Sequence, residues 1–147
     1  MQNWMDTERF SDVFKAHFTV DEEMIDMNEH VNNLHYLDWT NKTAGKHCRD
    51  VGWPSSRLRE IGKGFVVRSH QIQYREAALL GDEILIETWI ATMEKVSSLR
   101  KYRILRESDG RLLARAETVW AFIDRSTMRL AKIPIEIQEA FRASTYP

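Results

Sequence analysis

The stretch that decides the fold is residues 33–54, which read NLHYLDWTNKTAGKHCRDVGWP. Six of its positions recur at spacings of three and four and would share one face of a helix: Leu34, Leu37, Asn41, Ala44, Cys48 and Val51. Asn32 or Asn33 can act as the N-cap, because an asparagine side chain accepts a hydrogen bond from an unpaired first-turn amide. Gly52 and Pro54 then mark its end. The pattern predicts one long helix from about Asn33 to Val51.

On both sides of this helix the hydrophobic pattern alternates, as in strands. The predicted strands are Phe14–Val20, Phe65–Glu76, Glu83–Lys95, Leu99–Glu107 and Arg111–Asp124. Short connections between successive strands predict hairpins and therefore an antiparallel sheet. Pro134 suits the first position of a C-terminal helix that would run to about Ala143. We therefore expect an α+β domain whose long helix lies across one sheet face, with Tyr36 and Trp39 as further packing residues off the stripe.

Length and composition bound the class of protein. The chain has 147 residues, no internal repeat and no linker-like segment, which predicts a single domain over residues 1–147. A net charge of −1 argues against a domain-wide basic face for nucleic acid. The single cysteine, Cys48, cannot form an intramolecular disulfide. No signal peptide or long apolar window is evident, so we expect a soluble cytoplasmic protein without a membrane span.

Polar residues gather directly before the predicted helix. If residues 26–30 are extended, Asp26, Asn28 and His30 point to one side, next to free amides of the helix start. This arrangement offers a carboxylate, an amide, an imidazole and a dipole that favours developing negative charge. These are the components that attack on a thioester carbonyl requires. The alternative interpretation is a polar turn that only caps the helix.

The run from Asp26 to Trp39, DMNEHVNNLHYLDW, resembles the D-x-N-x-H-V-N-N-x-x-Y-x-x-W signature of acyl-acyl carrier protein thioesterases. It is also similar to the D-x-n-G-H-V-N-N-x-x-Y form of 4-hydroxybenzoyl-CoA thioesterase-like proteins. Both groups have the hot-dog fold, in which a curved antiparallel sheet wraps a long central helix. The resemblance implies that fold, with five to six strands.

The resemblance also implies roles for individual residues. Asp26 matches the family carboxylate, which acts as general base or nucleophile, while Asn28 and His30 match the pair that positions water and substrate. The backbone amide near Asn33 would donate to the oxyanion. Glu29 stands where many relatives have glycine, which predicts a different local backbone and a narrower pocket.

A second match, Ile72-Gln73-Tyr74-Arg75-Glu76-Ala77, resembles the tyrosine-containing strand of the family. Plant members have a glutamate and a cysteine after Tyr-Arg-Arg. Here Glu76 comes one residue early, and a slip by one residue in a strand turns a side chain to the opposite face. Glu76 is therefore a candidate third polar group, and a cysteine nucleophile at this place is excluded.

A basic run, Lys95, Arg100, Lys101, Arg103 and Arg106, is typical of a solvated strand face. In the resembling enzymes this region often lies near the nucleotide phosphates, which makes Ser98 and Arg100 candidates for contacting coenzyme A. Histidine and cysteine spacings do not suggest a metal site, and Cys48 fits a small core residue.

These observations predict hydrolysis of an acyl thioester of coenzyme A or acyl carrier protein to free acid and thiol, without metal or organic cofactor. The family further implies a homodimer joined edge to edge, and often a tetramer. One alternative is a hot-dog hydratase or dehydratase of enoyl or hydroxyacyl thioesters, although the similar D-x-N-P-x-H motif has an extra residue. The other is an acyl-CoA-binding domain without turnover.

Overall fold

The computed structural model of this chain describes residues 9–143. Its strands are β1 (Phe14–Thr19), β2 (Lys63–Tyr74), β3 (Glu83–Met93), β4 (Ser97–Arg106) and β5 (Leu112–Asp124), and its helices are α1 (Asn33–Asp50), α2 (Ser55–Glu60) and α3 (Ile135–Phe141). A short 3₁₀ turn, Glu22–Met24, precedes α1. Residues 9–12, which precede β1, are not helical.

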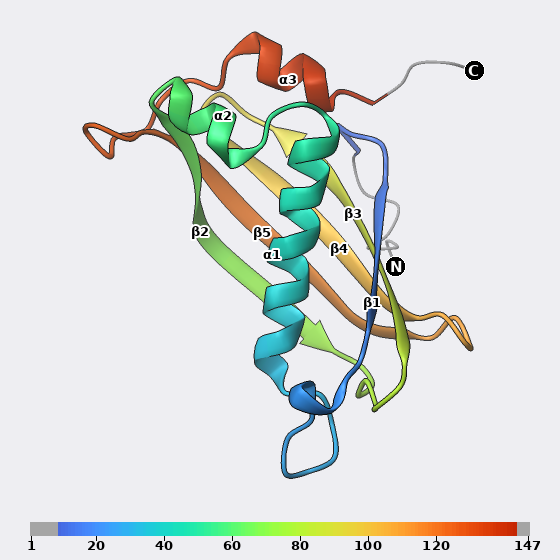
Figure 1. The fold of residues 1–147 in the computed structure, drawn as a ribbon. Coiled ribbons are helices and arrows are strands. Elements are labelled where there is room, and N and C mark those ends of the chain that lie inside the picture. Colours follow the sequence, from blue (N-terminus) through green and yellow to red (C-terminus); the bar gives the residue numbers. More distant parts are fainter. Residues whose placement is uncertain (1–8, 144–147) are drawn as a thin grey trace.

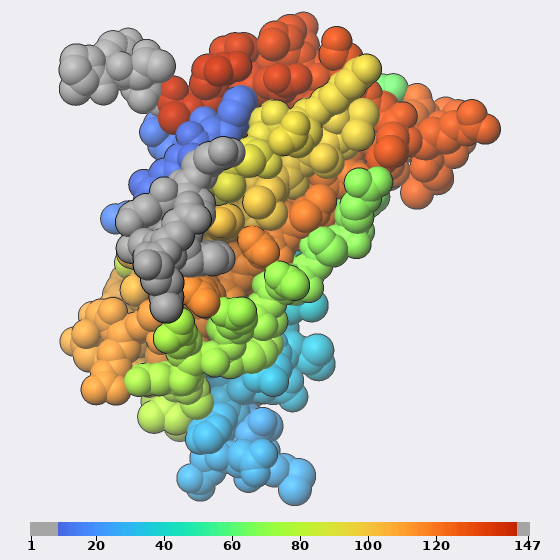
Figure 2. Space-filling model, turned by 180° about the vertical axis from the view of Figure 1, so that it is seen from behind, coloured from blue at the N-terminus to red at the C-terminus, as the bar shows by residue number. Residues whose placement is uncertain are grey.

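The five strands form one antiparallel sheet in the order β1-β3-β4-β5-β2, and α1 crosses one face of it (Figure 1). From behind, the strands run as diagonal bands over the other face, and α1 emerges only beyond the edge formed by β2 (Figure 2). This arrangement confirms the expected hot-dog architecture. It also ends the sheet with β2 on one side and β1 on the other.

One expected hairpin is wrong. β3–β4 and β4–β5 are hairpins, as predicted, but β2 pairs with β5 and lies at the edge opposite to β1 and β3. The connection over residues 75–82 therefore crosses the sheet near the start of α1 instead of turning back on β2 (Figure 1). This crossing brings the second sequence motif beside the first.

The boundaries of α1 match the prediction, but its buried face does not. The buried residues of the helix are Tyr36, Trp39, Thr40, Thr43, Ala44 and His47. Leu34 is 71% exposed and Asn41 is also exposed, so the N-terminal half of the expected stripe is wrong. The cause is that three positions of the true face are polar. Thr40 and Thr43 donate their hydroxyls to the carbonyls of Leu37 and Trp39, which satisfies them inside the core.

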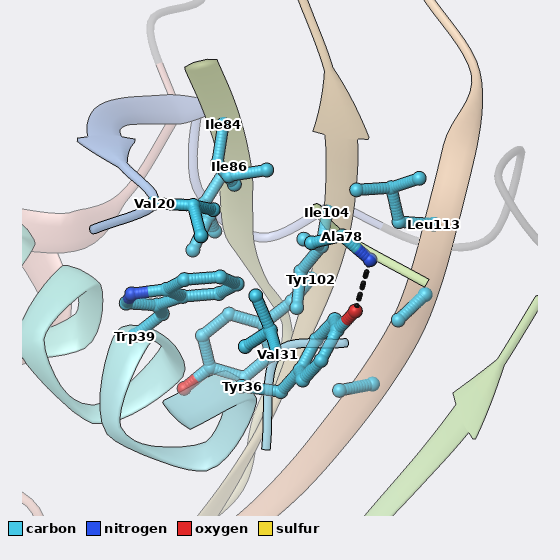
Figure 3. Packing of buried hydrophobic residues seen from close by; sticks show 12 residues of the cluster. Val20, Val31, Tyr36, Trp39, Ala78, Ile84, Ile86, Tyr102, Ile104 and Leu113 are labelled. Atoms are coloured by element: carbon cyan, nitrogen blue, oxygen red, sulfur yellow. Dashed lines mark hydrogen bonds between the residues drawn. The ribbon is translucent and has the colours of Figure 1, made fainter. Parts of the chain in front are cut away.

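Most of the buried hydrophobic residues form two clusters, one toward each end of α1. The first gathers around the N-terminal half and includes Tyr36, Trp39 and Ile104 (Figure 3). The second gathers around the C-terminal half, α2 and α3, and includes Trp53, Phe122 and Ile137. No helix within residues 9–143 is long and apolar enough to cross a membrane.

Candidate active site

The loop before α1 is a closed turn and not the extended segment that the sequence suggested. Ile25 and Val31 pair as an antiparallel bridge, and the amide of Asp26 donates to the carbonyl of His30 at 2.8 Å. Oδ1 of Asp26 accepts the amides of Asn28 at 2.9 Å and His30 at 3.4 Å. The carboxylate is thus held by the turn through one oxygen, which fixes its direction.

Glu29 lies at the tip of this turn with a φ of 64°. This left-handed backbone region costs most L residues free energy and is the one that glycine adopts readily. The chain therefore keeps a conformation that favours glycine, although it carries glutamate. Glu29 does not line the pocket beside Asp26 and His30, so its side chain does not narrow that pocket.

The start of α1 supplies an unpaired donor. Asn32 is the N-cap, and its Oδ1 accepts the amide of Leu34 at 2.9 Å. Among the described residues, nothing accepts a hydrogen bond from the amide of Asn33, the first residue of the helix. A free amide at a helix start is a favourable place for negative charge.

The 75–82 connection is fixed against this loop through one residue, Ala78. Its amide donates to the hydroxyl of Tyr36 at 2.9 Å, and its carbonyl accepts the amide of Val31 at 3.1 Å. Figure 3 shows the tyrosine of α1 reaching Ala78 across the buried cluster. Two segments that lie far apart in sequence are thereby held side by side.

Between them lies a pocket of about 340 Å³. Its lining residues come from the turn, the helix start and the end of β2, and they are Asp26, Asn28, His30, Val31, Asn33, Tyr36, Tyr74, Arg75, Glu76 and Ala77. The structure therefore brings together all five residues that the sequence suggested for the chemistry: Asp26, Asn28, His30, Asn33 and Glu76.

Glu76 reaches this pocket because β2 has already ended at Tyr74. Strand alternation, which placed its side chain on the opposite face, does not apply beyond the strand. Its Oε1 accepts Nη1 of Arg111 at 2.8 Å, and Oε2 lies 3.7 Å from Nη1 of Arg106. The carboxylate is thus already paired with cations at the rim of the pocket.

Ser98 and Arg100 lie elsewhere. Both line a second cavity of about 370 Å³ beneath the C-terminal half of α1, together with Cys48, and that cavity shares no lining residue with the first. The solvated-face interpretation of the basic run is wrong for two members, since Arg100 and Lys101 are buried. A contact of Ser98 or Arg100 with coenzyme A stays a prediction.

Sequence reasoning assigned Tyr36 to packing alone, and it gave Tyr74 and Arg75 no role. All three line the first pocket. The sequence could have indicated Tyr74 and Arg75, because both belong to the second motif. For Tyr36 the motif gave the position, but only the fold shows that its hydroxyl reaches Ala78. No group of three or more histidine, cysteine or acidic residues within 9–143 is arranged to hold a metal ion.

The fold and the polar pocket at the start of its central helix define a hot-dog domain. Residues 11–141 match the model of the acyl-ACP thioesterase N-terminal domain, and the chain belongs to this family.

Relatives and solved structures agree with this assignment. A chloroplastic palmitoyl-acyl carrier protein thioesterase of Gossypium hirsutum is 25% identical over 139 residues, 86% of this chain and 32% of that protein. An acyl-CoA thioesterase of Haemophilus influenzae is 26% identical over 112 residues, 76% of this chain and 81% of that protein. The chain spans about a third of the length of the plant relative.

A 1,4-dihydroxy-2-naphthoyl-CoA thioesterase from Synechocystis has the same fold. Its TM-score is 0.82 at 19% identity, with 88% of this chain and 96% of that chain covered.

Proposed function

We propose that this protein hydrolyses an acyl thioester, of coenzyme A or of acyl carrier protein, to a free acid and a thiol in the pocket at the start of α1. The observation that carries the proposal is that Asp26, Asn28, His30, Asn33 and Glu76 line one pocket. The names of relatives in the same family, which include hydrolases of both kinds of thioester, support it.

In this proposal Asp26 acts on water as a general base, or attacks the thioester carbonyl itself. Its Oδ1 is occupied by the amides of Asn28 and His30, and this supports a role for Oδ2 as the reacting oxygen. The side chains of Asn28 and His30 would orient the water and the thioester. A general base must be the ionised carboxylate, because only that form can accept a proton.

The free amide of Asn33 would donate to the oxygen of the tetrahedral intermediate. A preorganised donor at an oxyanion is typically worth about a hundred- to a thousandfold in rate. Since the amide belongs to the first helical residue, the helix dipole adds to its effect.

The deciding experiment is a thiol-release assay with a panel of acyl-CoA substrates on the wild-type chain and Asp26→Asn. The variant should lose about two orders of magnitude or more in turnover, the range for loss of an acid–base group. Its folding should be preserved, because an asparagine oxygen can still accept the two amides of the turn.

The matched control is Asp38→Asn, an exposed aspartate on α1 that pairs with Lys42 and does not line the pocket. This control should hydrolyse thioesters at the wild-type rate. Near wild-type turnover by Asp26→Asn would rule out the assigned role. Consumption of crotonyl-CoA without thiol release would instead favour the hydratase alternative.

We further propose that the protein forms a homodimer through β2. This strand is twelve residues long and occupies one edge of the sheet, and Val66 and Val67 on it are exposed. A long edge strand with exposed apolar residues is suited to pairing with another chain. Such pairing would place a second copy close to the end of β2, where Tyr74 lines the pocket.

A further inference from the structure

The second cavity is lined by the C-terminal half of α1, by α2 and by the inner face of the sheet. Its volume of about 370 Å³ falls in the range of small-molecule sites. Most of its wall is apolar, and the large side chains are Trp53, Phe65, Ile90, Trp120 and Phe141. Nothing in the proposed hydrolysis uses this space.

One charged group lines this cavity from within the core. Arg100 of β4 is only 3% exposed. Its Nη1 donates to Nδ1 of His47 at 2.9 Å and to the hydroxyl of Thr88 at 3.2 Å. Since a guanidinium can only donate, Nδ1 of His47 must be unprotonated, and the ring is neutral with its proton on Nε2. Burial and the neighbouring Arg100 lower the pKa of His47 to about 3, in agreement with a neutral ring.

The positive charge of Arg100 therefore has no anionic partner within residues 9–143, where no carboxylate lies within the 4.0 Å of an ion pair. The other arginines of β4 differ, because Arg103 pairs with Glu87 and Arg106 pairs with Asp82. Buried charges in proteins are ordinarily paired, since an isolated one is costly to remove from water. The ring of Phe141, 6.0 Å from Cζ, offers only a weak cation–π contact.

The free edge of the guanidinium indicates the kind of anion. Nη1 is occupied, whereas Nε and Nη2 make no hydrogen bond to the part of the chain that is described. Nε and Nη2 form the fork that binds a carboxylate through two parallel hydrogen bonds. Of the three described arginines that line the cavity, only Arg100 is buried, while Arg49 and Arg125 are exposed. One buried cation among aromatic and aliphatic side chains matches one carboxylate on an apolar body better than it matches a multiply charged phosphate.

We propose that this cavity binds an amphiphilic organic acid, with its carboxylate on Nε and Nη2 of Arg100 and its apolar body against Trp53, Phe65, Ile90 and Phe141. Arg49 and Arg125 also line the cavity, and Arg49 is exposed, so the mouth attracts anions as well. The acid is either a free carboxylic acid or the far end of an acyl group that itself ends in a carboxylate.

Calorimetric titration of the full chain with octanoate and with octanol tests the proposal. The wild-type protein should prefer the acid by about 10- to 100-fold, the range for a hydrogen bond to a charged group. In Arg100→Met this preference should vanish while octanol binding persists. Arg103→Met, which removes a paired arginine of the same strand, should keep the preference, as should Asp26→Asn. Binding is measured without turnover, so the result is independent of the proposed hydrolysis.

Equal affinity for acid and alcohol in the wild-type chain, or an unchanged preference in Arg100→Met, would overturn the proposal. A second measurement covers the case in which Arg100→Met does not fold. The Nε–Hε resonance that disappears in Arg100→Lys should move in the wild-type protein on adding octanoate and stay in place on adding octanol. A resonance that octanoate leaves unmoved would contradict the proposal.

The source of the acid follows from a comparison of hexadecanedioyl-CoA with palmitoyl-CoA as substrates. A long acyl chain is needed because Asn33 and His47 lie fourteen residues apart on α1, about 21 Å at the helical rise per residue. If the carboxylate is the far end of the acyl group, Arg100→Met should raise KM for hexadecanedioyl-CoA alone. If the ligand is a free acid, the variant should leave the ratio of the two KM values unchanged.

Discussion

At the scale of single residues, the hydroxyl of Tyr36 has a structural task that its place in the motif does not reveal. It accepts the buried amide of Ala78 and so holds the 75–82 connection against α1. The neighbouring Tyr74 packs edge-on against the ring of Tyr36, at 5.1 Å between centroids, and makes no such hydrogen bond with the described residues. A comparison of Tyr36 with Tyr74 therefore distinguishes the effect of the hydrogen bond from that of ring packing.

We expect Tyr36→Phe to lower the free energy of unfolding by about 1–3 kcal/mol, the cost of a buried donor left without an acceptor. Tyr74→Phe should change it by less than about 0.5 kcal/mol, as surface substitutions usually do. Urea denaturation of both variants gives the two values. A similar loss in both variants would show that the contact to Ala78 contributes little.

His47 should make the stability depend on pH. Its pKa is lowered from 6.5 to about 3, mainly by burial and then by Arg100. Below about pH 6.5 the unfolded chain therefore binds a proton at His47, whereas the folded chain binds that proton only near pH 3. The contribution of His47 to the unfolding free energy is fully present above pH 6.5. It decreases as the pH falls from 6.5 toward 3, and the loss is about 2 kcal/mol at pH 5.

His47→Gln should remove this dependence, because a glutamine oxygen can accept from Arg100 at every pH. The measurement is the difference in unfolding free energy between pH 7 and pH 5 for the variant and the wild-type chain. Carboxylates contribute equally to both proteins and cancel. Parallel pH profiles would contradict the lowered pKa.

At the scale of elements, the sequence predicted the positions of the strands and helices better than the way they pack. The ends of α1 were predictable because Asn32 and Gly52 signal them locally, and Gly52 has the expected positive φ of 88°. Its buried face was not, because Thr40, Thr43 and His47 are polar. The two threonine hydroxyls are satisfied by carbonyls of their own helix, whereas the partner of His47, Arg100, is brought to it only by the fold. The pairing of β2 with β5 is equally a long-range choice, which local patterns do not encode.

Most of the candidate site was predictable because its residues are close together in the sequence. Asp26, Asn28, His30 and Asn33 lie within eight residues, so their proximity hardly depends on the fold. Glu76 joins them only because the connection after β2 crosses the sheet. The extended segment expected for residues 26–30 failed because Asp26 accepts the amides of its own turn.

The 75–82 connection is also held in place by Arg106. Its guanidinium donates to the carbonyl of Ala77 at 3.0 Å and to Asp82 at 2.9 Å, and it also pairs with Asp109. The hydrogen bond to Asp82, and then that to Asp109, raise the pKa of Arg106 above its usual value. We expect Arg106→Met to lower the unfolding free energy by about 1–3 kcal/mol.

Arg103→Met serves as the comparison in urea unfolding. Its partner Glu87 lies across the same pair of strands, and an ion pair near the surface contributes about 1 kcal/mol or less. An equal loss in the two variants would mean that the connection does not rely on Arg106.

At the scale of the whole molecule, the sheet is open along β2, which has a neighbour on one side only within the described chain. If this edge pairs with a second copy, light scattering of the full chain should give twice the mass of one chain, or four times if dimers pair further. A mass of one chain at every concentration would count against the proposed dimer.

None of the described residues lines both cavities, and the two are built from different kinds of structure. The pocket with Asp26 is built from a turn, a helix start and a crossing connection, whereas the pocket with Arg100 is built largely from core strands and helices. Substitutions that reshape one leave every wall residue of the other in place. Reactivity and ligand preference can therefore diverge independently, in natural variants and in engineered ones.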